Sequence, residues 1–252
     1  MYFYISSTIL RQRRYMWYLS RDTRHMAYTK KSVRYIPITS TTDVTSYVSS
    51  ELINAISAGK SVTWLLSGGS AIPLIVEIAK TLSEHDLSKL HVTLTDERYG
   101  PLGHSNENWW QLEQAGFALP GADTYRVLQP GLIQAETAAK FGEKLQEFFA
   151  SSDLVFGFFG MGSDGHTAGI KPGSFDMTTD AYAVDYSGED FERITMTPKA
   201  IRQVGEAVLY AAGEAKRPAL ISLMEEDLPI EEQPAQILKR ITNWTIFTDI
   251  KF

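Results

Sequence analysis

Apolar and polar residues along the chain follow two different periods, which predicts strands that alternate with helices. From residue 43 to 58, apolar side chains recur at three- and four-residue spacing, as on one face of an amphipathic helix. The short, continuous apolar runs at 61–66 and 153–159 instead predict buried strands. Further strands are predicted at 90–95, 124–128, 181–186, 193–196, 207–211 and 244–248, and further helices at 73–82, 134–149, 198–203, 214–224 and 234–240.

This alternation predicts an α/β fold with a mostly parallel sheet and helices on both faces. Ligands of such sheets bind beyond the carboxyl ends of the strands. Three polar loops that contain glycine follow three of the predicted strands, at 67–70, 96–108 and 160–170. Because parallel strands end at the same edge, we expect these loops to form one site.

Length and composition are those of an ordinary globular protein. The chain has 252 residues, of which 44% are hydrophobic, so it can bury the core of one large α/β domain or of two small ones. It contains no cysteine, which excludes disulfides, a cysteine nucleophile and thiolate metal sites. No apolar stretch is long enough to cross a bilayer. This composition is compatible with the cytoplasm, where we expect the protein.

Charge is distributed unevenly along the chain. Residues 1–34 carry eight Lys/Arg and one acid, a net charge of +7, so the other residues carry −13 of the total of −6. Such an acidic body is a poor partner for nucleic acid or an anionic membrane, and we expect it to bind neither. If it binds an anion, it needs a few cations placed locally.

We interpret the basic segment 1–34 as an extension that is not part of the mature fold, with a start at Met26. A single α/β domain is then expected over residues 35–252. An organelle transit peptide and a nucleic-acid-binding tail are the alternatives for the extension.

The stretch LLSGGSAIP, residues 65–73, reads as a strand, a tight turn and the start of a helix. Gly68 and Gly69 allow close approach of the backbone to a ligand, and a helix N-terminus offers N–H groups and positive potential. A phosphate fits such a site, and a plain turn with Ser70 as the helix cap fits the pattern equally well. Neither a Walker loop nor a dinucleotide fingerprint is present.

The stretch LTDERYGP, residues 94–101, places three charged side chains at the end of a strand. Arg98 has the forked shape that binds phosphate oxygens, and Asp96 would then face the sugar or a water molecule. The alternative is a solvated loop in which the charges of Asp96, Glu97 and Arg98 partly cancel. The residue pattern alone favours the solvated loop.

The stretch GMGSDGHTAG, residues 160–169, contains four glycines, one acid and one histidine. Histidine is the usual general base, and a glycine loop at a strand end favours catalysis by His166 over a role as a turn cap. The other histidines show no ligand spacing with His166, so no metal site is expected. No G-x-S-x-G elbow indicates a serine hydrolase.

Together, these loops resemble the signature blocks of the 6-phosphogluconolactonases, which share a superfamily with the glucosamine-6-phosphate deaminases. The matching order extends from about residue 37 to the end of the chain. The matching blocks are SGGS, DER with the downstream Ser105-Asn106, GMGSDGHTA, RITMTPKAI and AAGEAKRPAL.

The resemblance implies a modified Rossmann-like α/β domain that hydrolyses 6-phosphogluconolactone in the oxidative pentose phosphate pathway, with no cofactor and no metal. It implies that His166 is the base that activates water and that Asp164 orients the loop of this base. We expect backbone N–H groups of the glycine loop to stabilise the oxyanion. The residues implied to bind the substrate, a sugar phosphate, are Gly68, Gly69, Ser70, Asp96, Arg98, Gly162, Arg193 and Lys216.

The chain departs from the family pattern at two places. Ala71 and Ile72 precede Pro73 where the usual block reads SGGSTP. HTAGIKP stands where the family commonly has HTASLFP, so residues 169–171 differ. The base is retained while the pocket wall changes, so the pattern defines the reaction type more closely than the substrate.

Two other functions are compatible with the sequence. A glucosamine-6-phosphate deaminase is similar around Asp96 and His166, but in that family a glutamate follows the histidine by a few residues. Here no carboxylate occurs before Asp176, and DER replaces the deaminase-like DEY. A non-catalytic sugar-phosphate sensor would keep Arg98 and Lys216 without needing the histidine. The retained base favours an enzyme whose activity falls when the imidazole is protonated.

Overall fold

A seven-stranded parallel sheet forms the centre of the protein. The computed structural model describes residues 32–38 and 40–251. The strand order is β1-β10-β9-β6-β2-β3-β5, and all neighbouring pairs are parallel. The strands of this sheet are β1 (Ser32–Pro37), β2 (Val62–Leu66), β3 (Leu90–Leu94), β5 (Asp123–Thr124), β6 (Leu154–Gly160), β9 (Glu206–Tyr210) and β10 (Asn243–Thr248).

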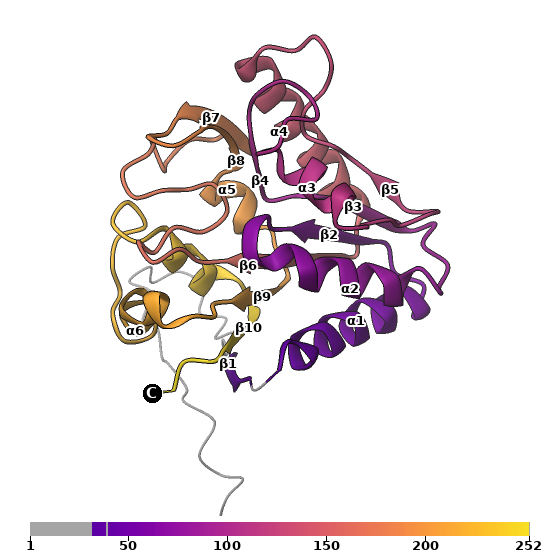
Figure 1. Cartoon of the computed structure of the whole chain (residues 1–252), viewed down its shortest axis with the longest axis horizontal. Helices are drawn as coiled ribbons and strands as arrows, with labels where there is room; N and C mark the ends of the chain where they lie inside the picture. The colour runs from indigo at the N-terminus through magenta and orange to yellow at the C-terminus, as the bar shows by residue number, and fades with distance from the viewer. Residues whose placement is uncertain (1–31, 39, 252) are drawn as a thin grey trace, which may run out of the picture.

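Helices cover both faces of this sheet, as the alternation of periods predicted. The first two helices lie side by side below the sheet in Figure 1, and α4 lies above it. Within the part of the chain that the structure describes, none of the helices has the length and apolar character needed to cross a membrane. The helices are α1 (Thr41–Ser57), α2 (Ile72–Leu82), α3 (Asn108–Gln114), α4 (Gln134–Ser151), α5 (Pro198–Ile201) and α6 (Arg217–Glu225), with 3₁₀ turns η1 (Gly69–Ala71), η2 (Glu214–Lys216) and η3 (Pro234–Arg240).

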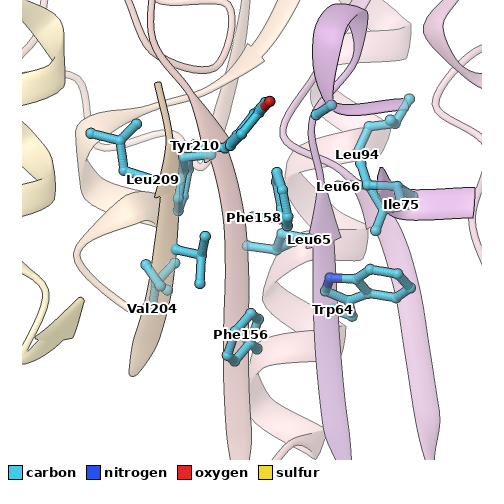
Figure 2. Close-up of a cluster of buried hydrophobic side chains, with 14 of the residues drawn as sticks. Trp64, Leu65, Leu66, Ile75, Leu94, Phe156, Phe158, Val204, Leu209 and Tyr210 are labelled. Atoms are coloured by element: carbon cyan, nitrogen blue, oxygen red, sulfur yellow. The ribbon is translucent and has the colours of Figure 1, made fainter. Parts of the chain in front are cut away.

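Burial of apolar side chains holds the sheet between its helical layers. All five residues of β2 are buried, and so are the five interior residues of β6. Strands that are buried on both faces read as continuous apolar runs, which is why the sequence predicted these two so clearly. Figure 2 shows Trp64 of β2, Phe156 and Phe158 of β6 and Leu209 of β9 in this core. A buried side chain of this size contributes about 1.5–3 kcal/mol relative to an exposed one.

The direction in which the chain builds the sheet reverses at β2. From β2 the chain adds β3 and β5 on one side, and later β6, β9 and β10 on the other. At such a switch point the connections leave a crevice outside the carboxyl ends of the strands. The loops after β2, β3 and β6 therefore meet at one edge of the sheet, as expected from the sequence.

A second sheet adjoins this edge, and it is antiparallel, which the sequence did not predict. It contains β4 (Asp96–Arg98), β8 (Glu192–Met196) and β7 (Ala183–Ser187), in the order β4-β8-β7. The segment 96–108, expected to be one long polar loop, therefore begins with a strand. Three residues are too few to show a period, so only the pairing with β8 identifies β4 as a strand.

Helix α4 packs closely against the second sheet, and Gly142 makes this approach possible. A Cβ at this position would lie 3.3 Å from the backbone nitrogen of Ala183 in β7. Glycine inside a helix costs about 1 kcal/mol relative to alanine. Close packing of α4 on β7 offsets that cost, because a larger side chain would push the two elements apart.

Several predicted boundaries differ from the structure. The strand predicted at 124–128 is limited to β5. The apolar residues Val127 and Leu128, which suggested a longer strand, are instead buried in the loop that follows. The helix predicted at 234–240 is the 3₁₀ turn η3. Residues 32–34, predicted to belong to the N-terminal extension, pair with β10. The rest of that predicted extension lies outside the described residues.

Candidate active site

His166 and Asp164 are hydrogen-bonded to each other in the loop that follows β6. His166 Nδ1 lies 2.6 Å from Asp164 Oδ1, and the same oxygen accepts the backbone N–H of His166 at 3.1 Å. Because the acceptor is a carboxylate, the proton of the neutral ring is on Nδ1, and Nε2 is left as the acceptor. Burial alone would raise the pKa of Asp164, but the hydrogen bonds and charge of His166 lower it. This geometry suits a general base and the carboxylate that orients it.

Glycine at position 162 leaves room for this pair. A Cβ on Gly162 would overlap His166 Nδ1 and crowd the oxygen of Asp164. The loop closes on itself through a hydrogen bond from the Gly162 N–H to the His166 carbonyl at 3.0 Å. Gly165 has a φ of +80°, which side chains rarely adopt. The glycines of this loop therefore shape it around the histidine.

The N–H groups of these glycines already donate within the protein. Those of Gly162 and Gly165 bond to carbonyl groups of their own loop. Those of Gly160 and Gly169 donate to hydroxyl groups of neighbouring segments, at 3.2 and 3.0 Å. The expectation that the glycine loop stabilises an oxyanion is therefore wrong for these four donors.

The SGGS loop after β2 forms η1, which leads into α2. Gly69 has a φ of +62°, and among the described residues the N–H groups of Gly69 and Ser70 have no hydrogen-bond acceptor. These are the kind of donors that a phosphate or an oxyanion needs. The alternative role of Ser70 as a helix cap is wrong, because α2 is preceded by Ala71 and has no side-chain cap. Gly68 permits contact with the start of α3, since a Cβ there would overlap the Asn108 side chain.

Glu97 in β4 is fully buried, so the expectation of a solvated loop is wrong for this residue. Its carboxylate accepts the backbone N–H groups of Asn108 at 2.6 Å, Trp109 at 3.0 Å and Arg98 at 2.7 Å. Two of these donors belong to the first turn of α3. Burial raises the pKa of Glu97 to about 8, although the three hydrogen bonds oppose this. The sequence offered one signal for this role. Glu107, the residue before α3, is not one of the residue types that usually cap a helix, so the first N–H groups of α3 need another acceptor.

Asp96 is the first residue of β4 in the second sheet, and it lies next to the histidine loop. Its Oδ2 is 4.0 Å from Arg193 NH1. Burial raises the pKa of Asp96, and the charges of Arg193 and His166 oppose the rise. Gly169 passes so closely that a Cβ there would lie 2.9 Å from the Cβ of Asp96. The structure thus brings Asp96 and the base together, as predicted from the two loops.

Arg98 and Arg193 are register partners across β4 and β8. Both guanidinium groups lie over the ring of Phe191, at 4.8 and 5.5 Å from its centroid. Like charges directly opposite each other on neighbouring strands repel. Asp190 reduces this repulsion, because its two carboxylate oxygens accept from Arg193 Nη2 at 3.0 and 2.9 Å. Among the described residues, the buried Nε atoms of both arginines have no hydrogen-bond partner. Such unpaired guanidinium donors are suited to an anionic ligand.

Lys216 lies at the same edge of the sheet but is not joined to the other cations by any contact among the described residues. It belongs to η2, which follows β9, and β9 pairs with β6 as far as Gly160 and Tyr210. Burial lowers the pKa of Lys216, and the charge of Asp249 opposes this. Topology therefore places Lys216 near the histidine loop, and its role as a phosphate ligand stays a prediction.

The turn between β7 and β8 contributes two side chains that the sequence analysis did not single out. Asp190 binds Arg193, and the ring of Phe191 packs against both guanidinium groups. The available signal was an acid and an aromatic residue that precede the RITMT block by one further residue, Glu192. In the described part of the chain, no three His, Asp or Glu side chains converge as metal ligands would.

Replacement of Gly162 by alanine is expected to separate His166 from Asp164, because the new methyl group would overlap the imidazole ring. Proton NMR should then lose the downfield Nδ1–H resonance of a short imidazole–carboxylate bond. The matched control is Gly160→Ala, whose methyl group would enter open space and should preserve the resonance. A resonance retained in Gly162→Ala would contradict the packing role assigned to this glycine.

Glu97 is expected to make stability fall as pH rises. Its folded pKa of about 8 exceeds the ordinary value of 4.5, so between these values the folded state holds a proton that the unfolded state has lost. The free energy of unfolding therefore decreases from about pH 5 to pH 8. Urea unfolding should show the wild type losing stability relative to Glu97→Gln over this range, with the exposed Glu143→Gln as control. A difference that stays constant with pH would refute the assignment.

Proteins of similar sequence are 6-phosphogluconolactonases. The 6-phosphogluconolactonase of Nostoc sp. is 32% identical over 182 residues, which cover 68% of this chain and 74% of that protein. The 6-phosphogluconolactonase of Rhizobium meliloti is 31% identical over 184 residues, which cover 69% of this chain and 78% of that protein.

Solved structures share the fold. A 6-phosphogluconolactonase from Shewanella baltica has a TM-score of 0.72 at 23% identity, over 86% of this chain and 96% of that one. The 6-phosphogluconolactonase of Trypanosoma brucei has a TM-score of 0.67 at 17% identity, over 86% and 97%. Residues 39–247 match the family described as Glucosamine-6-phosphate isomerases/6-phosphogluconolactonase. Because that match spans most of the chain, this protein belongs to the glucosamine-6-phosphate isomerase/6-phosphogluconolactonase family.

Proposed function

We propose that this protein hydrolyses 6-phospho-D-glucono-1,5-lactone to 6-phosphogluconate, the second step of the oxidative pentose phosphate pathway. The observation that carries the proposal is the 2.6 Å hydrogen bond between His166 Nδ1 and Asp164 Oδ1 at the carboxyl edge of the sheet. The relatives named 6-phosphogluconolactonase support the choice of substrate. We place the enzyme in the cytoplasm, with which a chain without cysteine is compatible.

His166 acts as the general base in this mechanism. Its Nε2 accepts a proton from water while the water oxygen bonds to the lactone carbonyl carbon. The tetrahedral oxyanion then collapses, the bond from the carbonyl carbon to the ring oxygen breaks, and the imidazolium returns its proton to that oxygen. A base of this kind contributes about 10²–10⁴-fold to the rate. Asp164, with its lowered pKa, stays ionised, holds the ring and stabilises the imidazolium.

Cations and backbone N–H donors near the base are available to bind the phosphate group and the oxyanion. The adjacent guanidinium groups of Arg98 and Arg193 support phosphate binding, to which Lys216 adds a third cation. The N–H groups of Gly69 and Ser70 are offered to the phosphate or to the oxyanion. Phosphate anchoring orients a lactone that is already an activated ester, so the chemical demand on the enzyme is modest.

The isomerase chemistry of the same family is disfavoured by the surroundings of Asp176. This is the first carboxylate after His166. It is exposed, and it accepts hydrogen bonds from the N–H and the hydroxyl of Thr178 at 2.9 and 2.6 Å. Its carboxylate therefore stabilises a local turn and is not hydrogen-bonded to the histidine. A sugar-phosphate sensor on this fold would bind substrate without turnover.

Loss of the base should abolish catalysis. With the lactone generated in situ and the spontaneous rate subtracted, His166→Ala is expected to lose about 10²-fold or more of the wild-type rate. The control is His85→Ala, an exposed histidine remote from the site. The wild-type rate should fall on acidification, because protonated His166 cannot accept a proton from water.

Each contrary outcome has a distinct meaning. Full activity in His166→Ala, or a flat rate from about pH 5 to pH 8, would remove this residue from the role of base. No lactone hydrolysis by the wild type would redirect the assay to ammonia release from glucosamine 6-phosphate. Sugar-phosphate binding without either reaction would establish the sensor.

A further inference from the structure

Asp190 joins two cations at the border of the site. Its Oδ2 lies 3.4 Å from Lys171 Nζ and 2.9 Å from Arg193 NH2, and its Oδ1 also accepts from Arg193 at 3.0 Å. Lys171 belongs to the segment 169–171, in which this chain departs from the common family pattern. Asp190 therefore bridges a cation of the segment that follows the histidine loop and a cation of β8.

Lys171 and Arg193 alternate with three carboxylates, those of Asp164, Asp190 and Asp96. Arg193 lies between Asp190 and Asp96, whose Oδ2 is 4.0 Å from Arg193 NH1. Burial would raise the pKa of Asp190, and hydrogen bonding by Arg193 and the charges of Arg193 and Lys171 lower it. The charge of Lys171 also acts on Asp164, the partner of the histidine. Lys171 and Arg193 thus connect the turn at Asp190 to the catalytic loop.

Of the three carboxylates, Asp190 is the one that can leave its cations without dismantling the site. Asp96 is buried, and Asp164 holds the base by two hydrogen bonds. The side chain of Asp190 is 41% exposed on a turn and can be solvated. The side chain of Arg193 is only 7% exposed, so it needs a new anion when Asp190 departs.

We propose that Lys171 and Arg193 bind an anionic group of the substrate, of the phosphate monoester class, and that Asp190 occupies both cations until that group displaces it. This inference rests on the proposed function and makes Lys171 a residue that determines specificity. A phosphate carries more charge and more acceptor oxygens than one carboxylate. It can therefore satisfy Lys171 and Arg193 together.

Removal of the competing charge should tighten anion binding. In titration calorimetry with inorganic phosphate, Asp190→Asn is expected to bind roughly three- to tenfold more tightly than the wild type. Lys171→Ala should bind more weakly by a similar factor, and Asp190→Asn should gain less in that background. The matched control is Glu189→Gln, which removes the same charge from the same turn and has no ion pair among the described residues.

Turnover provides a second readout that separates this inference from the proposed function. Asp190→Asn should lower KM for the phosphorylated lactone more than KM for gluconolactone without phosphate. Weaker phosphate binding in Asp190→Asn would overturn the inference, because Asp190 would then be a clamp that positions Arg193. An equal gain in Glu189→Gln would overturn it as an effect of net charge. If the phosphate affinities of the variants change as predicted but the protein does not hydrolyse the lactone, the proposed function is refuted and the anion site is still supported.

Discussion

Strand β2 pairs in parallel with β6 on one side and β3 on the other, and the positions of the SGGS, DER and histidine segments depend on this pairing. Parallel strands leave the sheet at one edge, so the loops that follow them meet there. Ser67, just after β2, then ties two of these loops together. Its hydroxyl donates to the Phe158 carbonyl at 2.8 Å and accepts the Gly160 N–H at 3.2 Å. Main-chain pairing between buried strands therefore provides the rigid frame for the base.

Two buried glutamate side chains fix the charged segment that follows β3. Glu97 accepts three backbone N–H groups and joins β4 to the start of α3. Glu107, also fully buried, is paired with Arg126 through two hydrogen bonds of 2.6 and 2.8 Å. Burial of a carboxylate is costly unless its oxygens find donors, and here one group uses the backbone and the other a guanidinium. The result is that Arg98 emerges from an ordered strand, directly opposite Arg193.

The site balances its charges before a substrate arrives. Outside the basic N-terminal segment the chain carries −13, so it attracts anions only where cations are gathered. In the site, Arg193 forms an ion pair with Asp190 and lies close to Asp96. Binding of an anionic substrate is then an exchange of partners, and its strength depends on how easily a carboxylate is released. This links the specificity of the site to the turn between β7 and β8.

The sequence by itself predicted the strands of the main sheet except β1, and the chemistry of its loops. Continuous apolar runs identify β2 and β6, and the glycine loop with His166 identifies the candidate base, because both signals are local. The tertiary structure decided which strands pair, that Asp96–Arg98 form a strand, that Glu97 is buried, and that Asp190 holds the cations. Asp96 pairs with Thr195, about a hundred positions away in the chain. No local pattern encodes such a contact, because its energy comes from backbone groups and charges that meet only when the chain has folded.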